Sequence, residues 1–127
     1  MIVLKGRPVS KKNNARIVRF GGHPGIVPSE AFCKYEVDCL KQLASCTERY
    51  KGYLHVKAEY WLPNYKWYPD LCNLLNATHD ILEKAGIYEN DRFIVNIDGS
   101  RIVGLSKKNP RAEITITTVD YELEVEE

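Results

Sequence analysis

The chain has 127 residues and a mass of 14.6 kDa, which suits a single domain, residues 1–127, and is too little for two. Its 44% hydrophobic and 28% charged residues exclude an intrinsically disordered or low-complexity chain. No apolar run reaches the ~20 residues that a membrane span requires, and the first residues lack the apolar core of a signal peptide. We therefore expect a cytoplasmic protein that has no membrane partner.

Charge is distributed unevenly along the chain, although the formal net charge is only +1. Residues 1–28 form a basic arm and loop without any acidic residue, and residues 120–127 form an acidic tail without any basic one. A basic arm is typical of proteins that bind a polyanion, because Lys and Arg release the counterions condensed around nucleic-acid phosphates. A solvated basic surface without a partner remains the alternative.

Apolar spacing, turn formers and helix caps predict a strand-rich chain with two helices. Period-two alternation indicates the strands and recurrence every three to four residues indicates the helices, for which Ser29 and Asp70 are favourable N-caps. The predicted elements are, in chain order, strands at 1–4 and 15–20, a helix at 29–45, a strand at 53–62, a helix at 70–85, and strands at 93–97, 101–105 and 111–119. Asp98-Gly99 predicts a β-hairpin. We expect an α+β fold, one small domain with a mixed β-sheet packed against two main helices.

Two connections between these elements combine turn-forming residues with bases or aromatic rings. Residues 8–28 form the longest predicted loop, interrupted only by the short strand at 15–20, and loops of this length in small domains usually carry function. The connection before Asp70 contains Tyr65, Trp67 and Tyr68 beside Lys66. Aromatic rings next to a base can stack on unpaired nucleobases, but a packed loop or a dimer contact is the commoner role, and we favour it.

The cysteines are expected to be reduced thiols rather than zinc ligands. Cys33, Cys39, Cys46 and Cys72 form no C-x-x-C pair and have no histidine at the spacing of a zinc site. Three of them lie in or beside the first predicted helix. There we expect them to be small buried hydrophobic side chains.

Asp70 at a helix entrance and Asp91 in a turn beyond the end of that helix are the candidate metal ligands. Hydrolysis of a phosphodiester with a hard cation such as Mg²⁺ requires carboxylates that converge on one point. A 15-residue helix is about 22 Å long, so the two carboxylates meet only if residues 88–93 return beside the helix start. The alternative is that Asp70 is only a cap and Asp91 only a turn residue.

The residues around Asp70 resemble the signature of a known family. The motif consists of Asp70-Leu71-Cys72-Asn73-Leu74, followed by Asp80, Lys84-Ala85-Gly86 and Asn90-Asp91. It is similar to that of the RusA family of Holliday junction resolvases, small endodeoxyribonucleases of phage and prophage origin, and the likeness covers essentially the whole chain. The resemblance implies a homodimer that binds a four-way DNA junction and makes paired nicks with Mg²⁺, or Mn²⁺ as a substitute, and without an organic cofactor.

Two positions depart from the catalytic pattern of that family. The resemblance implies an Asp-x-Asp pair at the start of the second helix, a lysine one turn later and an aspartate in the next turn. Asp70 matches the first of these residues and Asp91 the last, whereas Cys72 replaces the second aspartate and Asn76 the lysine. A thiol binds Mg²⁺ poorly, and an amide brings no positive charge to the transition state. Loss of one such group typically costs about 3 kcal/mol, so we expect a weakened or altered site.

The resemblance also suggests which side chains contact DNA. Lys11, Lys12 and Arg16 in the basic arm are candidates for phosphate contacts, as are Lys107 and Lys108, although the latter pair equally suits a charged sheet edge.

Three functions remain open. The protein cuts branched DNA slowly, with Asp70 and Asp91 as metal ligands; it binds branched DNA without cutting; or it is a small dimer whose basic arm engages a protein or RNA.

Overall fold

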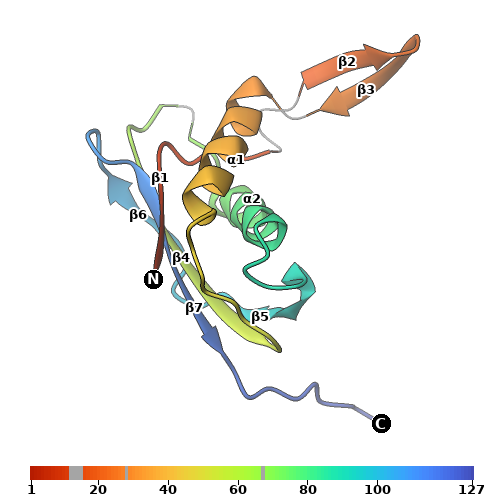
Figure 1. Cartoon of the computed structure of the whole chain (residues 1–127), viewed down its shortest axis with the longest axis vertical. Coiled ribbons are helices and arrows are strands. Elements are labelled where there is room, and N and C mark those ends of the chain that lie inside the picture. Colours follow the sequence, from red (N-terminus) through yellow and green to blue (C-terminus); the bar gives the residue numbers. More distant parts are fainter. Residues whose placement is uncertain (12–15, 28, 67) are drawn as a thin grey trace.

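The computed structural model describes residues 1–11, 16–27, 29–66 and 68–127, with the backbone alone at 16–20 and 23–27. Its elements are β1 (Ile2–Lys5), β2 (Arg16–Phe20), β3 (His23–Val27), α1 (Glu30–Leu43), β4 (Leu54–Leu62), α2 (Leu71–Lys84), the 3₁₀ turn η2 (Asp91–Phe93), β5 (Ile94–Asn96), β6 (Arg101–Leu105) and β7 (Arg111–Thr118). Within this part of the chain, five strands form one mixed sheet with the order β1-β7-β4, and β5 and β6 both pair with the outer edge of β4. The two helices cover one face of the sheet (Figure 1), which confirms the predicted α+β fold.

The core lies between this sheet and the helices. Every second residue of β4, from Leu54 to Leu62, is buried, and the residues between them are half-exposed on the other face. The buried face of α2 is the apolar stripe expected from its sequence, including Leu74, Ile81 and Leu82. The alternation of β4 and the helical period of α2 therefore define two surfaces that pack against each other.

Both predicted helix starts are confirmed. The hydroxyl of Ser29 accepts a hydrogen bond from the backbone N–H of Phe32 at 3.2 Å, and a carboxylate oxygen of Asp70 accepts one from the N–H of Asn73 at 2.8 Å. Each cap satisfies a backbone donor that the first helical turn leaves unpaired, which fixes where the helix begins. The helix α2 also ends where predicted, just before Gly86.

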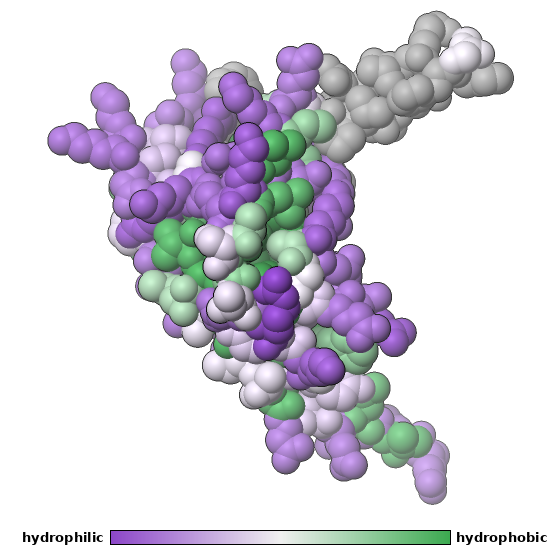
Figure 2. Space-filling view, in the orientation of Figure 1, coloured by the Kyte–Doolittle hydropathy of each residue, from purple (hydrophilic) through white to green (hydrophobic). Residues whose placement is uncertain are grey.

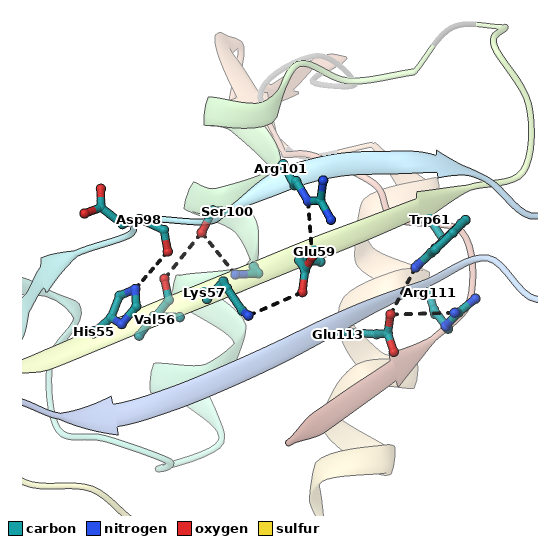
Figure 3. Close-up of polar contacts among 11 residues, drawn as sticks. His55, Val56, Lys57, Glu59, Trp61, Asp98, Ser100, Arg101, Arg111 and Glu113 are labelled. Atoms are coloured by element: carbon teal, nitrogen blue, oxygen red, sulfur yellow. Dashed lines mark hydrogen bonds and ion pairs between the residues drawn. The ribbon is translucent and has the colours of Figure 1, made fainter.

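The predicted hairpin at Asp98-Gly99 is wrong. β5 and β6 do not pair with each other but follow one another along the same edge of β4, both parallel to it. The Ser100 hydroxyl fills the gap between them, because it accepts from the N–H of Ala58 at 3.0 Å and lies 3.4 Å from the carbonyl of Val56 (Figure 3). Gly99 has a φ of +86°, so the turn that suggested a hairpin instead redirects the chain along one edge.

The strand predicted at 15–20 belongs to a separate hairpin. It corresponds to β2, which pairs antiparallel with β3 and projects from the body of the domain at the upper right of Figure 1. β3 falls within residues 8–28, which we predicted to be a loop apart from the strand at 15–20, so the loop prediction is wrong for residues 23–27. Pro24 is unusual in a strand, and a two-stranded edge tolerates it. Gly21 and Gly22 between the two strands have φ values of +56° and +88°, as a two-residue type I′ turn requires.

The start of the acidic tail lies against the sheet. The N–H of Val119 donates to the carbonyl of Tyr53 at 3.0 Å, and the ring of Tyr121 meets that of Tyr53 edge-on with the centroids 5.3 Å apart. Beyond this contact Leu123 and Val125 are exposed, and hydrophobic residues alternate with hydrophilic ones along the tail (lower right of Figure 2). No helix in the described residues is both long enough and apolar enough to cross a membrane.

The expectation that the helix-associated cysteines are buried holds fully for Cys39 alone. Cys33 is exposed, because α1 turns Phe32, Tyr35 and Cys39 rather than Cys33 toward the core, and Cys46, which follows the end of α1, is half-buried. Burial raises the pKa of the Cys39 thiol to about 11, which keeps it protonated near neutral pH. None of the four cysteines forms a disulfide bond.

A buried hydrogen bond joins the sheet to α2 and provides a test of their packing. The Tyr60 hydroxyl on β4 lies 2.7 Å from the Thr78 hydroxyl on α2, and both residues are buried. Tyr60→Phe leaves the Thr78 hydroxyl without this partner and is expected to lower the free energy of unfolding by about 1–2 kcal/mol. Adding Thr78→Val removes the orphaned group and recovers part of the loss. Urea unfolding of the unchanged protein, the two single variants Tyr60→Phe and Thr78→Val, and the double variant measures this coupling, and equal stabilities throughout would contradict it.

Candidate functional site

The start of α2 carries three of the four residues expected to form the catalytic set. Asp70 is its N-cap, with one carboxylate oxygen bonded to the N–H of Asn73 and the other 3.0 Å from that residue's side-chain amide nitrogen. The side chains of Asp70, Cys72 and Asn76 are all exposed to solvent. Cys72 and Asn76 lie one turn apart on the same face of the helix. This end of α2 therefore presents one accessible carboxylate with a thiol and an amide beside it.

Asp91, the fourth residue, lies beside the other end of α2. Its backbone N–H donates to a carboxylate oxygen of Glu83 at 2.8 Å. Three residues earlier, the hydroxyl of the buried Tyr88 donates to the carbonyl of His79 at 2.7 Å. These two bonds hold the segment 88–93 against the C-terminal half of the helix.

Asp70 and Asp91 are therefore not brought together within one chain. About 20 Å of helix separates the Cα positions of Asp70 and Glu83. We expected residues 88–93 to return beside the start of the helix; they return beside its end, because Ile87 and Tyr88 are buried in the core there. Among the described residues, no three His, Cys, Asp or Glu side chains gather into a group that could hold a metal ion.

His79 lies in α2 between Asp70 and the segment around Asp91, and the charge of Asp91 affects its pKa. Its Nε2 atom is buried and has no hydrogen-bond partner in the described part of the chain. Burial lowers the pKa of the imidazole, and the nearby charge of Asp91 opposes this shift without cancelling it. His79 is therefore neutral near pH 7.

The basic arm contacts α2 through Asp80. The Lys11 ammonium lies 3.1 Å from a carboxylate oxygen of Asp80, and Lys84 lies 3.4 Å from the same oxygen and 3.0 Å from Glu36 on α1. Burial opposes ionisation of Asp80, but hydrogen bonds and charge from the two lysines outweigh it and lower the pKa of the carboxyl. Lys11 also lies over the Phe32 ring, with its nitrogen 5.6 Å from the ring centroid. Lys11, a predicted DNA contact, thus has a structural partner while remaining partly exposed.

The other predicted DNA contacts differ in how available they are. Lys107 and Lys108 are exposed after β6 and form no ion pair with any described residue. Lys12 lies outside the described residues, and Arg16 begins β2 with its side chain outside them.

Arg111, which follows Lys107 and Lys108 in the sequence, belongs to the open face of the sheet. Its guanidinium lies 3.6 Å from a carboxylate oxygen of Glu113 and 4.9 Å from the centroid of the Trp61 ring. The indole N–H of Trp61 donates to the same Glu113 oxygen at 3.0 Å, so the three side chains form one contact network (Figure 3). Arg111 is therefore held by the sheet rather than presented to solvent with the two lysines.

Comparison with models of protein families shows the family of the chain. The family model of endodeoxyribonuclease RusA matches residues 5–117. The chain belongs to the RusA family. A search of curated proteins found no match. The matched range contains Asp70 and Asp91 and ends before the acidic tail, and membership of this family implies a nuclease that acts on Holliday junctions. RusA nucleases generally depend on a divalent metal.

The closeness of Asp91 to His79 predicts how the histidine titrates. Its folded pKa lies below the ordinary value of 6.5, so the unfolded chain takes up the proton first. The stability contributed by neutral His79 is complete above about pH 6.5 and is lost as the pH falls through the folded pKa. Asp91→Asn removes the opposing charge and is expected to lower the pKa of His79 further, whereas Asp70→Asn leaves it unchanged. NMR titration of the imidazole measures both, and an equal shift from the two variants would contradict this geometry.

Proposed function

We propose that this chain is a divalent-metal-dependent endonuclease that resolves four-way DNA junctions as a homodimer. The observation that carries the proposal is the RusA family match, which spans both Asp70 and Asp91. Paired nicks suit a two-fold dimer, because it presents two identical sites to a nearly two-fold substrate. Mg²⁺ is the expected metal, with Mn²⁺ as a substitute.

The donor groups suit a hard cation, but one chain does not assemble them. Asp70 and Asp91 offer exposed carboxylate oxygens, the ligands that Mg²⁺ prefers. They lie toward opposite ends of α2, so we assign each metal site to Asp70 of one copy and the partner's Asp91. A two-fold axis that crosses α2 near its middle brings the start of one helix beside the end of the other and generates two such sites.

The metal, when bound, supplies charge for phosphodiester hydrolysis and lowers the pKa of a water ligand. The residues of this chain orient and hold the substrate around it. The amide of Asn76 can donate a hydrogen bond to a phosphate oxygen but adds no positive charge there. Cys72 contributes a neutral thiol unless it is ionised. The site therefore retains its positioning groups and lacks part of the charge that stabilises the transition state.

Phosphate contacts from both ends of the sequence complete the DNA surface. Lys11, Lys12 and Arg16 in the basic arm and Lys107 and Lys108 after β6 position the backbone without reading base sequence. For Lys11 this requires that a phosphate share or replace its contact with Asp80, which is possible because the ammonium remains partly exposed. Junction affinity then falls steeply with rising salt.

Binding without cutting is the second candidate function. It is favoured by the neutral side chains at Cys72 and Asn76, one turn apart at the start of α2. Salt-dependent binding of a four-way junction with no nicks in Mg²⁺ or Mn²⁺ distinguishes it from the nuclease.

Restoring the charged residues of the family pattern tests the catalytic assignment. Cys72→Asp with Asn76→Lys is expected to raise Mg²⁺-dependent nicking of a labelled junction at least about tenfold, because it supplies a hard ligand and a cation. Cys33→Asp, at the exposed cysteine of α1, is the matched control and leaves the rate unchanged. Activity in every variant is lost in EDTA. Equal rates before and after the double change would show that the site lies elsewhere.

Complementation between two inactive variants tests the shared sites. Asp70→Asn and Asp91→Asn homodimers are each expected to lose nicking, since every site lacks one carboxylate. A mixed dimer of the two contains one site with both carboxylates and one with neither, so it regains nicking of one strand. If each site belonged to a single chain, the mixed dimer would have no intact site. A mixed dimer as inactive as its parents therefore rules out sharing, with co-purification on two different tags confirming that it formed.

A further inference from the structure

Two connections leave the sheet at the same end, and one of them leads along the chain to Asp70. β4 and β6 are parallel neighbours, and their last residues, Leu62 and Leu105, are paired. The connection from β4 to α2 and the one from β6 to β7 therefore begin at the same end of the sheet, at the upper left of Figure 1. The N–H of Ser106 donates to the carbonyl of Leu62 at 2.7 Å and ties the two connections together. Ligands commonly bind outside the carboxyl ends of parallel strands.

An apolar pocket of about 360 Å³ opens at this end of the sheet. Its lining residues come from both strands and from the connection to α2 and are Leu62, Tyr65, Tyr68, Ile102, Gly104 and Leu105. The volume is within the range of small-molecule sites, about 300–1,000 Å³. Tyr65 is 79% exposed and Tyr68 is 49% exposed, so our expectation of a packed loop is wrong within one chain. The two rings instead border an accessible cavity.

Three lysines are close sequence neighbours of the residues that line the pocket. Lys66 lies between the two tyrosines in sequence, and Lys107 and Lys108 follow Ser106. All three are exposed and have no ion-pair partner among the described residues, and no carboxylate belongs to the described lining. The backbone N–H of Lys66 donates to the Asn64 side-chain oxygen at 2.8 Å, which holds this turn in place. Aromatic rings bordered by cations suit a flat apolar group attached to phosphate.

We propose that this pocket binds an unstacked nucleobase of the DNA strand that reaches Asp70, an inference that rests on the proposed function. The base stacks on Tyr65 and Tyr68, and the lysines contact the phosphates that flank it. Buried Pro69 separates Tyr68 from Asp70, so a base held in the pocket places the neighbouring backbone at the start of α2. Stacking accepts any base, which gives preference for unpaired strands rather than for a sequence.

Photocrosslinking tests the pocket directly. A four-way junction carrying 5-iodouracil at the branch point is irradiated with the protein in EDTA, and a junction with the label in a paired arm serves as the comparison. The expected crosslinks lie on Tyr65 or Tyr68 and occur with the branch-point label only. Crosslinks confined to other residues would overturn the proposal, and this result needs no variant that might fail to fold.

Matched variants test the role of the rings. Tyr65→Ala with Tyr68→Ala is expected to abolish the crosslink and weaken junction binding about tenfold. The corresponding double change to Phe keeps the crosslink and the junction affinity. Tyr121→Ala, at a tyrosine of the tail that is 43% exposed, changes neither the crosslink nor the affinity. Unchanged junction affinity in the double Ala variant would overturn the proposal. Conversion of that variant from dimer to monomer, measured by light scattering, would also overturn it, because the two rings would then contact a second copy of the chain.

Separate readouts distinguish this proposal from the function on which it rests. Nicking of the junction reports the nuclease, and crosslinking to a single-stranded 5-iodouracil oligonucleotide reports the pocket. Crosslinks at Tyr65 or Tyr68 without nicking would support the pocket and count against the nuclease. Nicking with no crosslink at either tyrosine would overturn the pocket alone.

Discussion

Burial of α2 against β4 determines where each candidate residue lies. The apolar stripe of the helix packs on the alternating buried residues of the strand, with the Tyr60–Thr78 hydrogen bond inside the contact. Because the helix is rigid over about 20 Å, it holds Asp70 at one end and the segment around Asp91 at the other. In the proposed nuclease, a metal site that uses both carboxylates then requires two copies of the helix. Dimerisation would in this way be a condition of catalysis rather than an addition to it.

The sequence predicted the parts of the fold that depend on local signals. Ser29 and Asp70 cap the two helices as expected, because a cap is a bond between residues three apart. The Asp98-Gly99 turn misled us, since the same dipeptide serves a hairpin and a change of direction along one edge. What decides between them is whether β4 leaves that edge open, and this depends on strand pairing that no local pattern contains.

The site was less predictable for a related reason. The sequence indicated Asp70 and Asp91, but their separation depends on Tyr88 bonding to His79 and on the Asp91 N–H bonding to Glu83. The Lys11–Asp80 pair joins residues 69 positions apart, and the sequence around neither residue predicts that the two side chains pair. The aromatic pocket had a visible signal in Tyr65 and Tyr68. Their exposure, which decides against a packed loop, required the structure.

The two departures from the family pattern compensate each other in charge but not in chemistry. An aspartate at position 72 and a lysine at position 76 would be neighbours one turn apart and would partly neutralise each other. Cys72 and Asn76 replace both, so the net charge of this helix face is the same as with the pair. In the proposed nuclease, the attraction of the start of α2 for DNA is therefore preserved, whereas a hard metal ligand and a cation of the family pattern are missing. A lysine restored without the aspartate would lack its neighbour, so the two positions are expected to act together rather than additively.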